Sequence, residues 1–256
     1  MAKRERRLRL VIPVVTKDFR DREELRLLGS PGTEISVVSI ERGPVSIETA
    51  FDTALATPDT IRRIVEAERE GMDAVVIDCM DDPGMEAGRE LVSIPVVGPS
   101  QASMHLAAIL GHRFSIVTIL DERSVAPFEN QAKVYGVSEK LASVRWVEIP
   151  VLELHQDPER LVHDLVQESA AAIEQDQAHV IIFGCTGMLG YAEQVRLGLE
   201  QLGHGGVPVI DPVPAAVRLA EVFVDLCLSQ SKRSYPVPPV KPIVGFDVLG
   251  GKPTPG

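Results

Sequence analysis

The feature that most constrains this chain is an internal repeat of one strand-like segment. Asp73–Cys79 and His179–Cys185 share the same pattern of apolar residues, and each segment ends in a cysteine. The two cysteines lie 106 positions apart, which is far longer than the repeat of a solenoid protein. Ile94–Gly98 and Val207–Asp211 form a second pair at a similar spacing, and each precedes a helix-like stretch. The repeat predicts two related halves.

Short apolar segments alternate along the chain with longer amphipathic ones. Because the strand-like segments are apolar throughout, they favour parallel sheets covered by helices on both faces. The expected fold class is therefore α/β, with a duplicated half, so that two related subdomains each contain a parallel sheet. We expect the first subdomain to cover residues 1–112 together with 213–230, the second to cover 113–212, and a proline-rich tail to cover 231–256. The tail is either disordered or docked as an extended arm.

Several helix ends have their own sequence signals. Thr57, Asp82 and Asp157 each stand before a proline, the arrangement of an N-cap followed by proline at the first helical position. They predict three helices that begin at these prolines. Gly71 and Gly111 are expected to end two helices just before the next strand.

Composition and charge exclude several classes of function. The chain has 26 Lys+Arg and 37 Asp+Glu, a net charge of −11, which argues against a nucleic-acid partner. The longest stretch without Asp, Glu, Lys or Arg contains Leu91–Leu110 and is interrupted by prolines and a glycine, so we expect no membrane span. Three cysteines in 256 residues do not form a disulfide framework, and they indicate free thiols in a reducing cytoplasm.

Two of these thiols occupy equivalent places. Cys79 and Cys185 each follow an apolar strand, and ligands of open parallel sheets bind beyond the carboxyl ends of the strands. Two halves that face each other would present both cysteines to one cleft, where turn amides favour the thiolate. A single cysteine after a buried strand is often a small core residue, but core packing alone does not explain the repeated placement. Cys227 lies in an apolar helical pattern without a counterpart, and we expect it in the core.

Two acid–base groups on opposite sides of one carbon are what the inversion of a stereocentre needs. One thiolate removes the proton from one face, and the other thiol returns a proton to the opposite face. The two sulfurs would lie roughly 7 Å apart with the substrate between them. We expect no metal and no cofactor, because the sequence contains no zinc motif, no dinucleotide-binding motif and no P-loop.

The residues around these cysteines resemble those of hydantoin racemases, which belong to the aspartate/glutamate racemase superfamily. The resemblance extends from about Gly43 to Lys241 and is carried by Gly43–Glu48, Asp81–Ala87, Pro95–Gly98, Met104–Ala107, Arg113–Thr118 and Gly184–Met188. It implies two pseudo-symmetric Rossmann-like subdomains with the active site in the cleft between them, Cys79 and Cys185 as the acid–base pair, a 5-substituted hydantoin or allantoin as the small-molecule substrate, and a homo-oligomer.

The resemblance also implies a set of residues that contact the substrate. Backbone amides in the turns after the two cysteines would hold the ring carbonyls and the enolate. Ser46 corresponds to a cleft residue of the family or is a loop serine, and Thr118 ends a strand and is expected to line the pocket. The residues expected to contact the substrate are Pro13, Thr16, Ser46, Met80, Asp81, Thr118, Thr186 and Gly187.

The chain departs from the family at the end of the first strand. Members typically carry an Asn-Pro-Asn-Thr-Ser-like run there, whereas this chain has Ile12–Thr16 and keeps only the proline and one hydroxyl. This leaves room for a less polar substrate group. Asp78 stands where a small or neutral residue is common, and strand alternation points it away from the Cys79 side, so we interpret it as structural.

Other functions fit parts of the same pattern. Arylmalonate decarboxylases resemble the superfamily but generally keep only the second cysteine. Maleate isomerases keep two cysteines and use one as a nucleophile. An aspartate or glutamate racemase would need groups for a carboxylate and an ammonium, in which Ile12–Thr16 is poor. A non-catalytic protein that binds small molecules or senses redox state through its thiols is the remaining alternative.

Overall fold

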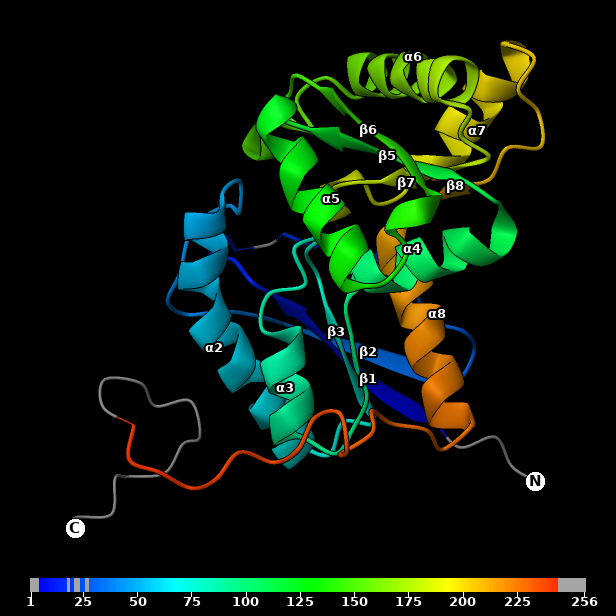
Figure 1. Ribbon diagram of the computed structural model, residues 1–256. Coiled ribbons are helices and arrows are strands. Elements are labelled where there is room, and N and C mark those ends of the chain that lie inside the picture. Colours follow the sequence, from blue (N-terminus) through cyan, green and yellow to red (C-terminus); the bar gives the residue numbers. More distant parts are fainter. Residues whose placement is uncertain (1–4, 18, 21–23, 26–27, 244–256) are drawn as a thin grey trace. The chain divides into compact units, whose positions relative to one another are not determined.

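The computed structural model describes residues 5–17, 19–20, 24–25 and 28–243 of the chain (Figure 1). It forms two compact units: one contains the described residues up to Gly98 and from Val217 onward, and the other contains Pro99–Ala216. Each unit has a four-stranded parallel sheet, and the strand orders, β2-β1-β3-β4 and β6-β5-β7-β8, are equivalent. The predicted α/β class with two related parallel-sheet halves is confirmed.

The first unit is built around a sheet whose central strands are buried. Its strands are β1 (Arg6–Ile12), β2 (Thr33–Ser39), β3 (Ala74–Ile77) and β4 (Val96–Val97), and its helices are α2 (Ala50–Arg69), α3 (Met85–Leu91) and most of α8 (Pro212–Asp225). Helices α2 and α3 pack together on one side of the sheet, and α8 lies on the other (Figure 1). Because helices cover both faces, every residue of β3 is buried, which explains why this strand is apolar throughout.

The second unit repeats this arrangement with more helices. It contains β5 (Phe114–Ile119), β6 (Leu141–Val147), β7 (Val180–Phe183) and β8 (Val209–Ile210), with α4 (Pro99–Leu110), α5 (Val125–Val134), α6 (Pro158–Asp176) and α7 (Ala192–Gln201). Four short 3₁₀ turns join them, at Glu122–Ser124, Ser138–Lys140, Val151–Glu153 and Thr186–Met188. Helices α6 and α7 cover one face of the sheet, and α4 and α5 cover the other (Figure 1).

The boundary between the units differs from the division expected from the repeat. Sequence reasoning placed residues 99–112 in the first half, whereas the compact units place α4 in the second. The physical reason is that α4 packs against β5, β7 and α5, which all belong to the second unit. Helix α8 crosses the other boundary, and Asp225 near its end bonds to Arg6 at the start of β1 at 2.7 Å.

The predicted helix starts have mixed outcomes. Asp157 does cap α6, accepting a hydrogen bond from the backbone of Arg160. The prediction at Thr57 is wrong: α2 begins eight residues before Pro58, because Thr49 and Asp52 form a capping box there. The prediction at Asp82 is also wrong, because α3 begins after Gly84, which has a left-handed backbone.

The C-terminal end of α8 is closed by a turn that contains Cys227. Cys227 is exposed, not in the core, because α8 ends at Asp225. Its backbone is left-handed (φ 54°), and the amides of Cys227 and Leu228 close a Schellman turn on the carbonyls of Val224 and Phe223.

Beyond that turn the chain is docked as an arm. Gln230 bonds to both the amide and the carbonyl of Val96, and Lys232 bonds to the carbonyls of Arg89, Glu90 and Val92. Residues 244–256 of the expected tail lie outside the described part of the chain. Among the helices in the described part, none is both long and apolar enough to cross a lipid bilayer.

Candidate functional site

At the carboxyl end of the first sheet, the loops after β1 and β2 run beside each other. The amide of Val15 bonds to the carbonyl of Pro44 at 3.0 Å, and the Thr16 hydroxyl donates to the carbonyl of Val45 at 2.5 Å. The structure thus places Thr16 next to the loop that carries Ser46, whose hydroxyl donates to Glu48 at 3.2 Å. Pro13 is buried just after β1.

Cys79 lies two residues beyond β3, at the same end of this sheet. Its side chain is partly exposed, and its carbonyl accepts a hydrogen bond from Asp82 that closes a tight turn. Met80, between them, is buried. The Asp82 carboxyl group fills the space where a Cβ of Gly98 would lie, so the turn depends on a glycine after β4.

Asp81 brings a carboxyl group into this turn. The Thr53 hydroxyl, on the first turn of α2, lies within hydrogen-bond distance of Asp81 Oδ2. Burial raises the pKa of Asp81, and the nearby charge of Asp52 raises it further, while the Thr53 contact acts in the opposite direction. The net shift is upward, which favours the protonated form relative to an ordinary aspartate.

Asp78, the residue before Cys79, is held in a buried ion pair. Its two oxygens accept hydrogen bonds from Nε and Nη2 of Arg20 at 2.8 and 2.9 Å, and neither side chain is more than 1% exposed. Because a buried charge is stable only when it is paired, this contact ties Arg20 to the end of β3. The pair gives Asp78 the structural role expected of it.

Cys185 occupies the equivalent position in the second unit, two residues beyond β7. It caps the 3₁₀ turn Thr186–Met188, and its sulfur accepts a hydrogen bond from the amide of Gly187 at 3.4 Å. Thr186 is buried. A donor aimed at the sulfur stabilises a thiolate more than a thiol. This turn therefore supplies the amide environment predicted for a reactive cysteine.

The backbone before Cys185 is fixed by Thr118 at the end of β5. The Thr118 hydroxyl donates to the carbonyl of Gly184 at 3.2 Å, and the side chain is buried. A Cβ on Gly184 would lie 2.3 Å from Thr118 Cβ, so only glycine fits beside this strand. A Cβ on Gly187 would likewise lie 2.7 Å from Leu154 Cδ1.

The predicted site residues thus fall into two groups. Those of the first unit lie on loops at the carboxyl end of one sheet, and those of the second unit lie at the carboxyl end of the other. Sequence reasoning missed Thr53. The signal that identifies it is the Thr49–Asp52 capping box, which starts α2 early enough to bring Thr53 to the Cys79 turn.

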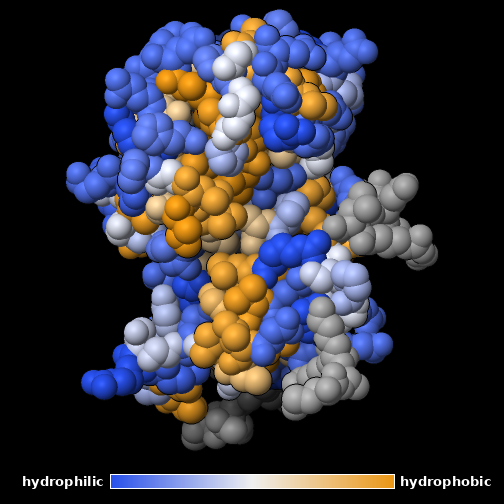
Figure 2. Space-filling view, turned by 90° about the vertical axis from the view of Figure 1, so that its right-hand side faces the viewer, coloured by the Kyte–Doolittle hydropathy of each residue, from blue (hydrophilic) through white to orange (hydrophobic). Residues whose placement is uncertain are grey.

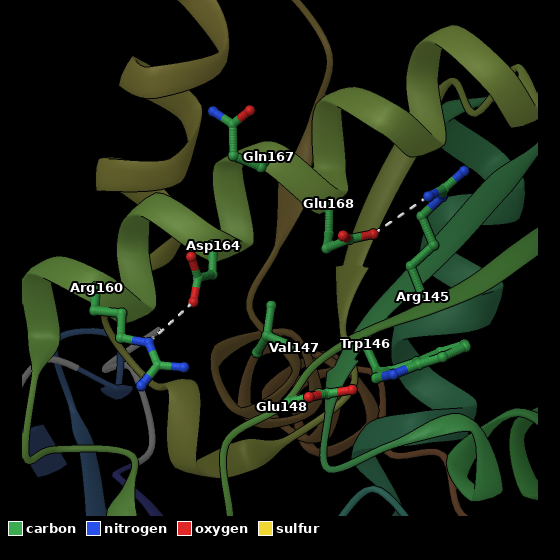
Figure 3. Close-up of a pocket in the computed structure, with 8 residues that line it drawn as sticks. All are labelled: Arg145, Trp146, Val147, Glu148, Arg160, Asp164, Gln167 and Glu168. Atoms are coloured by element: carbon green, nitrogen blue, oxygen red, sulfur yellow. Dashed lines mark hydrogen bonds and ion pairs between the residues drawn. The ribbon is translucent and has the colours of Figure 1, made fainter.

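A pocket of about 480 Å³ lies elsewhere in the second unit, between β6 and α6 (Figure 3). It is lined by Arg145, Trp146, Val147, Glu148, Arg160, Asp164, Gln167 and Glu168. Its arginines are already paired with acidic neighbours: Arg145 with Glu168 at 3.2 Å and Arg160 with Asp164 at 3.4 Å. None of its residues is a predicted site residue, and we assign it no part in the chemistry.

Comparison with known proteins identifies the family. Residues 22–220 match the Asp/Glu/hydantoin racemase family. The chain belongs to this family. It is 41% identical over 214 residues to a hydantoin racemase of Pseudomonas sp. (strain NS671), and the match covers 83% of each chain.

Two solved structures are similar along nearly the whole chain. The allantoin racemase from Klebsiella pneumoniae is 34% identical with a TM-score of 0.84, and the match covers 94% of this chain and 96% of that one. The allantoin racemase from Pseudomonas fluorescens is 37% identical with a TM-score of 0.85, and the match covers 93% of this chain and 100% of that one. The chain is therefore an isomerase of the racemase family, as the resemblance implied.

Proposed function

We propose that this racemase acts on a carbon acid of the cyclic ureide class, a 5-substituted hydantoin or allantoin, with Cys79 and Cys185 as its two bases. The observation that carries the proposal is the equivalent placement of the thiols. Each lies two residues beyond the third strand of a sheet, and the two sheets have the same strand order. The hydantoin racemase and the two allantoin racemases described above support the substrate class.

The reaction needs only these two groups. One cysteine thiolate takes the proton from the chiral carbon, so that a C–H bond breaks, an S–H bond forms and the electron pair moves into an enolate. The other cysteine then gives its proton to the opposite face, so that its S–H bond breaks and a new C–H bond forms. The two thiols end with exchanged protonation states. Sulfurs roughly 7 Å apart can do this and cannot form a disulfide.

Backbone amides would stabilise the charge that develops on the ring oxygen. In the second unit, the amide of Gly187 already points toward the sulfur of Cys185, and Thr186 adjoins it. In the first unit, Met80 and Asp81 occupy the corresponding turn. Donors fixed in place before the reaction stabilise an enolate without reorganisation, and such donors are typically worth about 3–4 kcal/mol each.

The remaining predicted residues would shape the pocket. Pro13, Thr16 and Ser46 belong to the two adjoining loops of the first unit. The hydroxyl of Thr16 is bonded to the backbone, as is that of Thr118, so we propose that these threonines hold their loops and present methyl groups. Such a surface suits a substrate group that is less polar than the family's Asn-rich loop would accept.

The assembly is part of the same proposal. We propose that the two units, divided near residues 98–112 and 213–217, enclose the active site between them, and that the enzyme is a homo-oligomer in the cytoplasm. Its three cysteines are free thiols, as a reducing compartment allows. Hydrophobic residues are exposed on α4 and on α8, where Ile109 is 82% and Val222 is 47% exposed, and Figure 2 shows exposed hydrophobic residues in the view that it presents.

The test is an assay of optical rotation with single enantiomers of a 5-substituted hydantoin and of allantoin. Cys79→Ala and Cys185→Ala should each reduce racemisation at least about a thousandfold, since each removes one of two obligatory proton carriers. Cys227→Ala is the matched control, because this exposed cysteine has no role in the proposal. Racemisation by either active-site variant would contradict the two-base mechanism. Turnover of aspartate, glutamate or maleate in place of the ureides would contradict the substrate class.

A further inference from the structure

The arm that follows α8, residues 229–235, is bonded to the outer edge of the first sheet (Figure 1). Strand β4 is an edge strand of that sheet, because the strand order is β2-β1-β3-β4. The carboxamide group of Gln230 accepts a hydrogen bond from the amide of Val96 at 3.0 Å and donates one to its carbonyl at 3.2 Å, as a residue of a further strand would. The same carbonyl accepts a hydrogen bond from Nε of Arg89 in α3 at 3.0 Å. Side chains of the arm and of α3 thus hold the backbone of β4 from outside.

The arm also holds the carboxyl end of α3. The Lys232 ammonium group can use all three of its protons there, on the carbonyls of Arg89, Glu90 and Val92 at 2.7, 3.1 and 2.7 Å. The last carbonyls of a helix have no helical partners, and a positive charge beside them is stabilising. The buried guanidinium group of Arg89 lies 5.5 Å from the centre of the Tyr235 ring and donates to the Tyr235 hydroxyl at 3.3 Å. The arm therefore fixes both α3 and β4.

The turn that carries Cys79 lies at the opposite ends of these two elements. The amide of Asp82 donates to the carbonyl of Cys79 at 3.1 Å, and α3 begins three residues later at Met85. Gly98 directly follows β4, only two residues after Val96, and the Asp82 carboxyl group fills the space where its Cβ would lie. Asp82 is buried with a left-handed backbone (φ 48°), which few residues other than glycine adopt, so the turn depends on the groups packed against it. A shift of β4 would reach Cys79 through these contacts.

The second unit links its thiol turn to its fourth strand in another way. Asp211 directly follows β8, as Gly98 follows β4, and its Oδ2 accepts a hydrogen bond from the amide of Gly190 at 2.8 Å. Gly190 lies five residues after Cys185, so the residue after the strand makes the link itself. Gly98 has no side chain that could make such a bond. The position of the Cys79 turn therefore depends more on what holds β4 and α3 from outside.

We propose that Gln230 and Lys232 position Cys79 for proton transfer, acting through β4 and α3. This inference rests on the proposed function, in which Cys79 is one of the two bases. A base must lie within hydrogen-bond distance of the proton it removes, and a small displacement of that base lowers the rate of the chemical step more than it weakens substrate binding. Both arm residues are positioning residues. Loss of their bonds should lower kcat at nearly constant KM and should loosen the Cys79 turn alone.

The kinetic test replaces each arm residue with an apolar one of similar size in the full-length enzyme. Lys232→Met and Gln230→Leu should each lower kcat for racemisation of the ureide about tenfold, while KM changes less than about twofold. Lys232→Arg should restore kcat, because a guanidinium group can also donate to several carbonyls. Lys140→Met is the matched control: Lys140 donates to the carbonyl of Gly111 at 3.5 Å in the second unit, and kcat should not change.

Amide hydrogen exchange gives a readout that a general loss of stability would not reproduce. In Lys232→Met and Gln230→Leu the amide of Asp82 should exchange about tenfold faster. The amide of Met188 makes the equivalent bond to the carbonyl of Cys185, at 3.2 Å, and should keep its rate. Equal acceleration of both amides, or an unchanged kcat in both variants, would overturn the proposal. If the unmodified enzyme does not racemise ureides, the proposed function fails, and the exchange rates still show whether the arm holds the Cys79 turn.

Discussion

The loops after β3 and β7 hold equivalent thiols in different surroundings. Beside Cys79 lie a buried ion pair and two further acidic residues, Asp81 and Asp82, whereas the sulfur of Cys185 is approached by a backbone amide next to Thr118 and Leu154. The common topology determines where each thiol lies. The different neighbours surround the two turns with charged side chains in one unit and place a backbone amide on the sulfur in the other.

The largest expected effect on stability comes from the buried ion pair between Arg20 and Asp78 beside Cys79. Arg20→Met leaves the Asp78 carboxylate buried without its partner, which should lower the free energy of unfolding by about 3–5 kcal/mol. Arg123→Met removes an exposed arginine that pairs with Asp121 and should change the stability little, because solvent screens an exposed pair. Urea denaturation of both variants measures the difference. Equal, small losses would mean that the ion pair does not hold the Cys79 loop.

Acid should weaken the first unit through Glu221. Burial alone would raise the pKa of Glu221, but hydrogen bonds from Ser30, Thr33 and Arg218 outweigh it and lower the pKa to about 2. Because this pKa lies below its ordinary value of 4.5, the stabilisation is complete above pH 4.5 and is lost as the pH falls toward 2. It amounts to about 3 kcal/mol.

Glu221→Gln tests this assignment. The variant should be less stable than the original protein at pH 7, and the difference should shrink below pH 4.5 and disappear as the pH falls toward 2. Urea denaturation at a series of pH values measures the difference. A stability difference that does not change with pH would show that the carboxylate form of Glu221 does not stabilise the fold.

A smaller effect on stability, but a large one on activity, is expected in the second unit. Gly184→Ala places a methyl group against Thr118 and should cost about 1–3 kcal/mol of stability. Because the backbone that carries Cys185 must shift, racemisation should fall about a hundredfold. Gly205→Ala is the control, since its nearest neighbour, Glu200 Cγ, lies at an ordinary 3.6 Å. Activity retained in Gly184→Ala would mean that the position of Cys185 is not critical.

The sequence predicted the fold where a local pattern agrees with the packing around it. The repeated apolar strands identified both sheets, and Asp157 identified the start of α6, because a good cap there faces no competing signal. The prediction at Thr57 failed because the capping box at Thr49 starts the helix earlier. The prediction for Cys227 failed because a Schellman turn ends α8 just before it.

The candidate site was predictable only in part. The strand ends predicted where Cys79 and Cys185 lie, each two residues beyond a strand, since topology brings the residues after parallel strands to one edge. Thr53 was missed because its contact with Asp81 joins segments 28 residues apart, and no local pattern encodes such a contact. The boundary near α4 could not be predicted either, because a helix that joins β4 to β5 in the sequence can pack on the sheet before it or on the sheet after it.

The central claim is that one thiol from each unit serves one face of the substrate carbon. The most direct measurement follows hydrogen isotopes in D₂O from each pure enantiomer, early in the reaction. Two separate thiols predict that the newly formed enantiomer carries one deuterium at the chiral carbon while the remaining starting enantiomer keeps its protium. A product that retains protium, or a starting enantiomer that gains deuterium as fast as product forms, would indicate a single base and contradict the account.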